Sequence, residues 1–325
     1  MRPCLSNPLS LALAITLLLS QSGLIAAQEV SKYPDRPINF VIAALPGSAP
    51  DLASRLICRE AEKILGQPII PVNKTGGSFT IGTAAIAAAK PDGYTIGVAL
   101  GPATFVVPHI GKIAYNPVKD LQWIMQFGYL NLGVLVKGNS QFKTFKDLIT
   151  FARQNPKKLT HGCAGIGSFG HIAMEQIARK EGVMITHIPF KGGPDMMPAL
   201  MGGHVQFVTG DFNEALLEAG EIRMPLLLAE TPSAEYPKIP TLKDLGYDVL
   251  VPSFVNVCGP KGIPDDIAKK LEAAFTAATK SPDFTKEMKA LRVAAVYRNS
   301  NDLGDYVARN YEVFGRVLKE MGLAK

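Results

Sequence analysis

Ile38-Asn-Phe-Val-Ile-Ala-Ala44 is a short apolar run, and the turn-forming segment Pro46-Gly-Ser-Ala-Pro50 follows it. From Asp51 to Leu65 apolar residues recur at helical spacing, and Gly66 closes the pattern. A run of this length bounded by turn residues predicts a buried strand, and the spacing after it predicts a helix that ends at a glycine. This strand, loop and helix unit is the building block of an α/β fold.

The same alternation repeats along the chain. Further strands are predicted at 68–72, 94–100, 131–136, 159–163, 185–189, 205–209, 225–229 and 254–258. Helices are predicted at 76–90, 144–154, 170–180, 195–201, 210–219, 264–279 and 303–321. Strands that alternate with helices favour sheets of mainly parallel type, and 325 residues exceed the usual size of one domain.

Two lobes follow from this order of elements. Residues 131–252 hold a complete set of strands and helices for lobe 2. The tail after residue 253 adds one strand and two helices, too few for a sheet of its own, so we expect residues 28–130 and 253–325 to form lobe 1. Two α/β lobes with mixed, mainly parallel sheets, joined by a double crossover, leave a ligand cleft at the carboxyl ends of the strands.

The first 27 residues have the pattern of a secretory signal peptide. Arg2 precedes the apolar run Leu9–Leu19, and small residues end the segment at Ile25-Ala26-Ala27. The run is shorter than the ~20 residues of a membrane-spanning helix. Cys4 lies before the apolar run, which argues against a lipid anchor. We expect a soluble, exported protein in the periplasm.

Charge and cysteine content exclude some classes of function. The formal net charge is +6, but acidic residues are interspersed and no basic block with aromatics occurs, so nucleic-acid binding has little support. Beyond the signal segment the cysteines are Cys58, Cys163 and Cys258. Their odd number leaves at least one thiol unpaired, and we expect small buried residues, with any pairing open.

Four loops of small residues lead from a predicted strand into a predicted helix. They lie at 46–51, 75–83, 165–171 and 192–195. Each offers backbone N–H groups at a helix N-terminus, where an anion is favoured. The alternative is that the small residues only form tight turns and that Asp51 caps its helix.

Gly165-Ile-Gly-Ser-Phe-Gly170 matches the dinucleotide-binding pattern, but the next strand leads to Lys191 where an acidic residue is required. No cofactor is therefore expected. Ile166 occupies the place of the first glycine of a serine hydrolase elbow, and the five histidines show no close metal-binding spacing, so neither a catalytic nor a metal site is expected. Ser168 and His171 remain open as ligand-binding residues, with helix capping by Ser168 or an exported hydrolase as alternatives.

Nine short motifs then run in order along nearly the whole chain after the signal segment. They are Tyr33-Pro-Asp-Arg-Pro-Ile, Pro46-Gly47 with Asp51, Leu65-Gly-Gln-Pro, Pro91-Asp-Gly-Tyr94, Tyr115-Asn-Pro-Val-Lys-Asp120, Pro189-Phe-Lys-Gly192, Gly202-Gly203 before Val205, Pro240-Thr241 and Gly259-Pro-Lys-Gly-Ile-Pro264. In these the chain resembles the extracytoplasmic receptors of tripartite tricarboxylate transporters, the TctC or Bug family.

The resemblance implies a two-lobed, type II periplasmic binding protein rather than an enzyme. Such a receptor, expected as a monomer, closes on a small mono- or dicarboxylate, aliphatic or aromatic, and presents it to membrane transporter subunits. A receptor that presents its ligand to a signalling partner is the alternative. Carried over by position, the expected ligand contacts are Gly47, Ser48, Asp51, Gly77, Ser78, Gly167, Ser168, Phe169, His171 and Asp211.

The chain departs from the family pattern at the first loop. Pro46-Gly-Ser-Ala-Pro-Asp51 stands where the family has Pro-Gly-Gly-Gly-Thr-Asp, so Pro50 removes a backbone donor and Ser48 adds a hydroxyl. At the other loop, Phe169 replaces a small or hydroxyl residue. Its ring could narrow the site or stack on an aromatic acid, and the sequence leaves both open.

Overall fold

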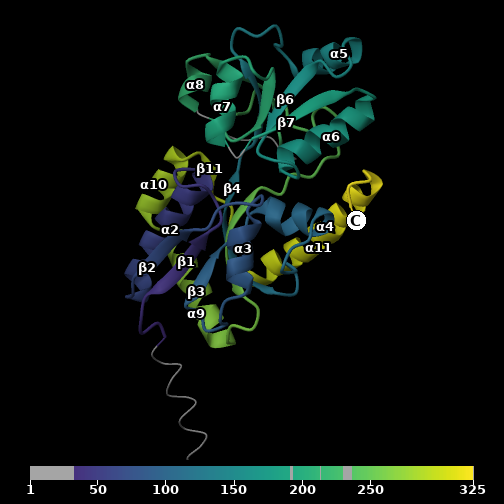
Figure 1. Ribbon diagram of the computed structural model, residues 1–325. Coiled ribbons are helices and arrows are strands. Elements are labelled where there is room, and N and C mark those ends of the chain that lie inside the picture. The colour runs from purple at the N-terminus through teal and green to yellow at the C-terminus, as the bar shows by residue number, and fades with distance from the viewer. Residues whose placement is uncertain (1–32, 191–192, 213, 230–235, 325) are drawn as a thin grey trace, which may run out of the picture.

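The computed structural model describes residues 33–190, 193–212, 214–229 and 236–324. They form two lobes, one above the other in Figure 1, each built on one sheet. The expected signal peptide at residues 1–27 lies outside these ranges. Within them, no helix combines the length and the apolarity that crossing a membrane requires.

Lobe 1 carries a six-stranded sheet in the order β11-β4-β10-β3-β1-β2. Its strands are β1 (Ile38–Ile42), β2 (Ile69–Asn73), β3 (Thr95–Val98), β4 (Leu121–Leu130), β10 (Phe254–Pro260) and β11 (Val293–Ala294). Strand β1 pairs in parallel with β2 and β3, whereas β10 and β11 pair in antiparallel fashion. Because β10 lies between β3 and β4, the tail of the chain returns to the first sheet.

Lobe 2 carries a five-stranded sheet in the order β7-β6-β8-β5-β9. Its strands are β5 (Gly133–Lys137), β6 (Leu159–Cys163), β7 (Ile185–Pro189), β8 (Phe207–Gly210) and β9 (Ile222–Leu227). Strand β6 is parallel to β7 and β8, and β5 is antiparallel to β8 and β9. The expected α/β fold with two mixed sheets is confirmed.

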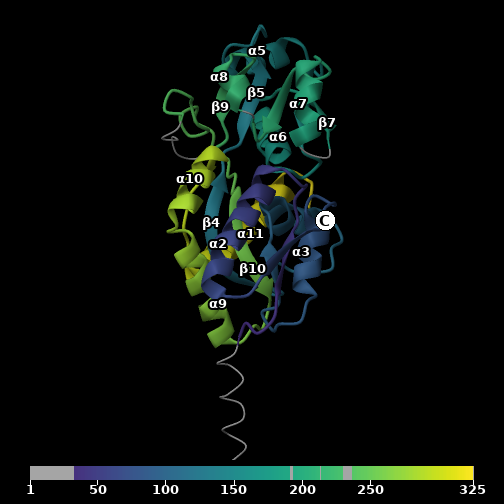
Figure 2. The same ribbon diagram turned by 90° about the vertical axis from the view of Figure 1, so that its left-hand side faces the viewer.

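Helices cover both sheets (Figures 1 and 2). Those of lobe 1 are α2 (Ala49–Leu65), α3 (Thr80–Ala87), α4 (Val107–Ile110), α9 (Asp265–Ala278), α10 (Pro282–Ala290) and α11 (Ser300–Glu320), with a π-helical turn at Pro102–Val106. Those of lobe 2 are α5 (Phe145–Gln154), α6 (Phe169–Glu181), α7 (Gly193–Met201) and α8 (Glu214–Glu218).

The helix after the first strand has the ends that its sequence predicts. Ser48 precedes it in extended conformation, and Pro50 lies in the first turn, where a missing N–H costs no helical hydrogen bond. Gly66 follows the helix with a left-handed φ of 69° and donates its N–H to the carbonyl of Glu62. The glycine C-cap is confirmed.

Several elements differ from expectation. No element is predicted at β4, the π-helical turn, α4, α10 or β11, and α3 is shorter than predicted. No strand was predicted at β4, because its ladder with β10 has two register shifts that break a simple alternation, and because Gln126 is buried within it. Its side-chain amide donates to the carbonyl of Gly128. Helix α3 is shorter than the predicted 76–90, because Ser78 and Phe79 adopt left-handed φ angles of 52° and 75° just before it.

The lobes also touch away from their two connections. Phe169 of α6 packs on Phe314 of α11, with ring centroids 5.7 Å apart. Arg292, after α10, forms an ion pair with Glu214 of α8. Figure 2 shows α10 at the end of lobe 1 that faces lobe 2. An apolar contact and an ion pair therefore hold the lobes together in this arrangement.

Candidate functional site

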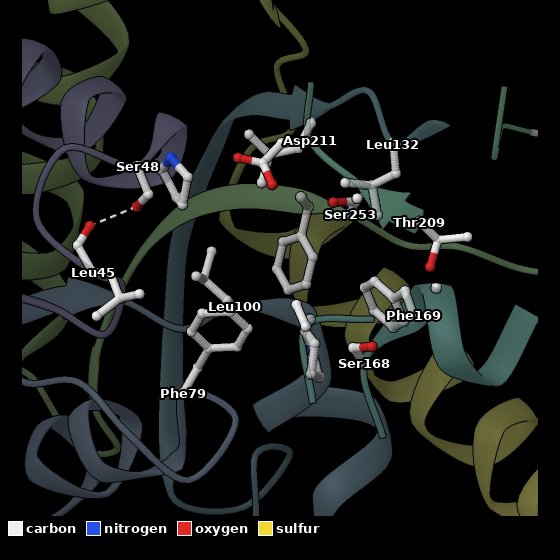
Figure 3. Close-up of a pocket in the computed structure, with 18 residues that line it drawn as sticks. Leu45, Ser48, Phe79, Leu100, Leu132, Ser168, Phe169, Thr209, Asp211 and Ser253 are labelled. Carbon is white, nitrogen blue, oxygen red and sulfur yellow. Dashed lines mark hydrogen bonds between the residues drawn. The ribbon is translucent and has the colours of Figure 1, made fainter. Parts of the chain in front are cut away.

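The candidate site is a pocket between the lobes (Figure 3). Its volume is about 840 Å³ including the part open to solvent, within the range of small-molecule sites. The walls are mostly apolar, with four hydroxyl residues and one acid. The lining residues are Leu45, Ser48, Pro50, Phe79, Leu100, Gly101, Pro102, Leu130, Leu132, Ala164, Ser168, Phe169, Gly170, Thr209, Gly210, Asp211, Ser253 and Phe254.

The loop between β1 and α2 is organised around the Asp51 carboxylate. Gly47 donates its N–H to Oδ2 at 2.8 Å, Asn73 donates its amide to Oδ1 at 2.8 Å, and Nε of Arg55 lies 3.1 Å from both oxygens. Burial acts to raise the pKa of Asp51, but these hydrogen bonds from Asn73, Arg55 and Gly47 hold it below its ordinary value. Asp51 thus fixes the loop from behind the pocket wall.

Ser48 brings this loop to the pocket. Its Oγ donates to the carbonyl of Leu45 at 2.6 Å, which leaves the oxygen lone pairs for a ligand. The N–H groups in the first turn of α2 also have no acceptor within the helix. Pro50, in the same turn, has no N–H group. Gly47 lies on the outer side, in the wall of a neighbouring opening that also includes Ser48 and Asp211.

The loop between β6 and α6 forms the opposite wall. Gly165 and Gly167 adopt φ angles of 94° and 82°, which only glycine tolerates readily. Ser168 is the N-cap of α6, and its Oγ accepts the N–H of His171 at 3.3 Å. Helix capping by Ser168, one of the expected alternatives, is confirmed.

His171 lies beneath this loop rather than in the pocket lining. Its Nδ1 accepts the N–H of Gly167 at 3.3 Å, and burial lowers the pKa of the imidazole. The serine hydroxyl and the imidazole therefore each hold the loop backbone, an arrangement unlike that of a nucleophile and its general base. The geometry gives the hydrolase alternative no support.

Phe169 forms a wall of the pocket and joins the lobes. A Cβ atom at Gly101 would lie 2.2 Å from Cε2 of Phe169, so only a glycine in lobe 1 leaves room for this ring. Of the two roles left open for Phe169, its contacts with Gly101 and Phe314 favour narrowing of the pocket.

Phe79 is a lining residue that the sequence did not reveal. Gly77, Ser78 and Phe79 all have left-handed φ angles, a strained geometry for the last two. This turn places the Phe79 ring in the pocket, while Gly77 and Ser78 lie outside the lining. The Gly76-Gly77 pair signals a turn, but no sequence rule identifies the aromatic residue that the turn presents.

Asp211 contributes the only ionisable side chain to the lining among the described residues. It directly follows β8, and in Figure 3 its carboxylate is directed toward the Ser48 side of the pocket. The residue is half-buried, and burial raises the pKa of its carboxyl group. Its place at the end of a strand was expected from the sequence.

Two histidines and an acid lie together behind the lobe 2 wall. His171, Glu175 and His187 have their ligand atoms within 4.8 Å of one another, a set of the types that bind divalent transition metals. The sequence expectation of no metal pair overlooked the four-residue spacing of His171 and Glu175 on α6, and could not place His187 beside them.

Glu175 and His187 also begin a chain of close polar contacts that continues through His161 to Thr209. Nε2 of His187 lies 2.9 Å from Oε1 of Glu175, close but poorly aligned. Nδ1 of His187 lies 2.6 Å from Nδ1 of His161, whose Nε2 lies 2.7 Å from Oγ1 of Thr209. The chain therefore links a partly exposed acid to a residue of the pocket wall.

The three cysteines play no part in the pocket lining. Cys58, Cys163 and Cys258 are buried and unpaired, as expected for small buried residues. Burial raises the pKa of the Cys163 thiol to about 11 and raises those of the other two as well, so all three are poor nucleophiles at neutral pH.

The structure thus divides the expected contact residues into two groups. Ser48, Ser168, Phe169 and Asp211 line the pocket. The remaining expected residues, Gly47, Asp51, Gly77, Ser78, Gly167 and His171, lie in or behind the loops that form it. The sequence missed Phe79, which a strained turn presents, and Thr209, Ser253 and Phe254, which lie at strand ends.

Comparison with known proteins places this two-lobed chain in a family. The sequence model described as "Tripartite tricarboxylate transporter family receptor" (TctC) matches residues 53–323. The "UPF0065 protein in gbd 5'region" of Cupriavidus necator is 34% identical, covering 96% of this chain and 95% of that protein. Protein BugT of Bordetella pertussis is 26% identical, covering 97% and 98%.

A solved structure supports the same assignment. An R. palustris protein determined with adipate superposes with a TM-score of 0.82 at 25% identity, covering 90% of this chain and 99% of that one. The family match spans most of the chain, and the fold and the inter-lobe pocket agree with a receptor. The chain belongs to the tripartite tricarboxylate transporter family of periplasmic receptors, TctC.

Proposed function

We propose that this protein reversibly captures a small mono- or dicarboxylate in the pocket between its lobes. The observation that carries the proposal is the pocket itself, which has walls from both lobes and the N-termini of α2 and α6 at its edge. Helix N-termini and hydroxyl groups bind a carboxylate without a basic side chain. The relative solved with adipate supports this class of ligand.

The contacts would divide between binding and positioning. Ser48, Ser168 and Asp211 would contact the ligand, and Phe169 would close over it. Asp51, Gly47, Gly167 and His171 would hold the two loops in shape, and Gly77 with Ser78 would position the Phe79 ring. No step of this capture requires covalent chemistry.

Delivery of the ligand to membrane subunits of a tripartite tricarboxylate transporter is part of the proposal. It includes export to the periplasm by the N-terminal segment and action as a monomer. Co-purification of the receptor with membrane subunits from ligand-fed cells would test the partnership. Recovery of a sensor protein in place of transporter subunits would favour the signalling alternative.

Titration calorimetry against aliphatic and aromatic acids tests the capture itself. We expect saturable binding of at least one carboxylate. The variant Ala164→Trp fills the pocket and should abolish that binding. The matched control Ile166→Trp places the same ring in the same loop at a residue that is 66% exposed, and should bind normally. Absence of heat from every carboxylate, with binding of sugars instead, would overturn the proposal.

A further inference from the structure

Asp211 has no cationic partner within the part of the chain that the structure describes. Among the described residues no ion pair involves it, and none of the described lysines, arginines or histidines lines the pocket. Arg292 shares the neighbouring opening with Asp211, but its guanidinium is paired with Glu214. A carboxylate in a mostly apolar pocket is costly unless a ligand supplies the missing charge.

The neighbouring hydroxyl of Ser48 does not relieve this carboxylate. Its hydrogen is donated to the carbonyl of Leu45 at 2.6 Å, so the pocket receives only oxygen lone pairs from it. Asp211 and Ser48 lie in the walls of the same two openings. Both present acceptors to a ligand.

Thr209 lies in the same part of the pocket lining, where its Oγ1 is 2.7 Å from Nε2 of His161. The surrounding protein therefore engages this hydroxyl as well.

The Oγ1 atom of Thr209 is also close to α6, because a Cβ at Gly170 would lie only 2.0 Å from it. Asp211 and the Oγ of Ser48 therefore present acceptors, and no cationic side chain, to this part of the described pocket wall. A second ligand carboxylate beside Asp211 would meet a like charge.

We propose that Asp211 forms a subsite for a cationic nitrogen, so that the preferred ligand is an amino acid-like zwitterion with an ammonium group apart from its carboxylate. This inference rests on the proposed capture of a carboxylate and names the class of acid. The ligand carboxylate binds toward the N–H groups of the two loops, and the ammonium group donates to Asp211. Burial, which raises the pKa of Asp211, makes the empty subsite unfavourable and adds to the gain on pairing.

Matched pairs of acids test the subsite by titration calorimetry. The pairs are butanoate and 4-aminobutanoate, hexanoate and 6-aminohexanoate, and 4-methylbenzoate and 4-(aminomethyl)benzoate, with adipate as the diacid of six carbons. In the pair that fits the pocket, we expect the amino acid to bind at least about tenfold more tightly than its partner. Adipate should bind more weakly than 6-aminohexanoate.

The variant Asp211→Asn should remove this preference, so that the amino acid and its amine-free partner bind equally. Asp248→Asn, an exposed acid of the same lobe, is the matched control and should keep the preference. Thermal unfolding of each variant verifies that it is folded. Equal or tighter binding of the amine-free acids, unchanged in Asp211→Asn, would overturn the subsite and leave the proposed function standing. Failure of every acid to bind the wild-type protein would overturn the proposed function itself.

Discussion

Asp51 and Asp211 are the same side chain in opposite surroundings. Asp51 lies in the first turn of α2, is buried, and receives hydrogen bonds from Gly47, Arg55 and Asn73, with a pKa below its ordinary value. Asp211 follows β8, lines the pocket without a cationic partner, and has a raised pKa. The comparison teaches that a carboxylate with protein hydrogen-bond donors around it stabilises a binding loop, whereas a carboxylate at the pocket wall without a cationic partner is available to a ligand.

Removing the satisfied carboxylate should have the largest effect. Asp51→Ala leaves the N–H of Gly47 and the side chains of Arg55 and Asn73 without their acceptor, and should lower the free energy of unfolding by about 3 kcal/mol. Denaturant unfolding measures the loss, with Asp248→Ala as an exposed control. Unchanged stability together with lost ligand affinity would instead make Asp51 a direct ligand contact.

Removing one donor should make Asp51 more like Asp211. Asn73→Ala deletes the amide that donates to Oδ1 of Asp51 and to the carbonyl of Ala44, and should cost about 1 to 2 kcal/mol of stability. The pKa of Asp51, followed by NMR titration, should rise. A pKa that stays low would mean that Arg55 and Gly47 suffice.

The two acids should affect stability with opposite dependence on pH. The raised pKa of Asp211 means that its stabilising contribution is present in acid and is lost as the pH rises through that pKa. In the ligand-free protein Asp211→Asn should therefore raise the melting temperature at pH 7. We expect the gain in stability to be smaller than the losses predicted for Asp51→Ala and Asn73→Ala. The advantage should vanish below about pH 4, the ordinary pKa of aspartate.

The contribution of Asp51 has the reverse sign. Because its pKa is lowered, the stability it provides is present above the ordinary value and is lost as the pH falls through the lowered pKa. The deficit of Asp51→Asn should therefore shrink in acid. Melting temperatures of Asp51→Asn and Asp211→Asn, each relative to the wild-type protein, measure both contributions from pH 3 to 7. The same pH dependence for both variants would refute the opposite signs.

Breaking the neighbouring ion pair should have the smallest effect. Glu214→Gln frees Arg292, which shares an opening with Asp211, at a stability cost of less than about 1 kcal/mol because the arginine is partly exposed. We expect a slightly lower affinity for the ligand, since the pair joins the two lobes. A tenfold loss of affinity would show that this pair controls lobe closure.

Much of the fold was predictable because hydrophobic spacing reports burial directly. The run at β1 and the helix ended by Gly66 follow from local pattern, and the return of the tail to lobe 1 was expected because the tail has too few strands for a sheet of its own. Strand β4 escaped because a buried glutamine and two register shifts are consequences of its neighbours. The sequence does not show which residues will lie next to β4 in the folded protein.

The site was predictable in its loops and less so in its walls. Glycines and serines before helices indicate where the chain turns toward a ligand, which located Ser48 and Ser168. Phe79 and Thr209 carry no such signal. The partner of Asp51 at Asn73 and the chain from Glu175 to Thr209 depend on contacts between strands and helices far apart in sequence.

A crystal structure with the acid that calorimetry finds to bind most tightly tests the central claim most directly. We predict that the ligand lies between the lobes, with its carboxylate facing the N-termini of α2 and α6 and with Asp211 within hydrogen-bonding distance of its nitrogen. An ordered ligand bound elsewhere on the molecule, with the inter-lobe pocket occupied only by solvent, would contradict the account.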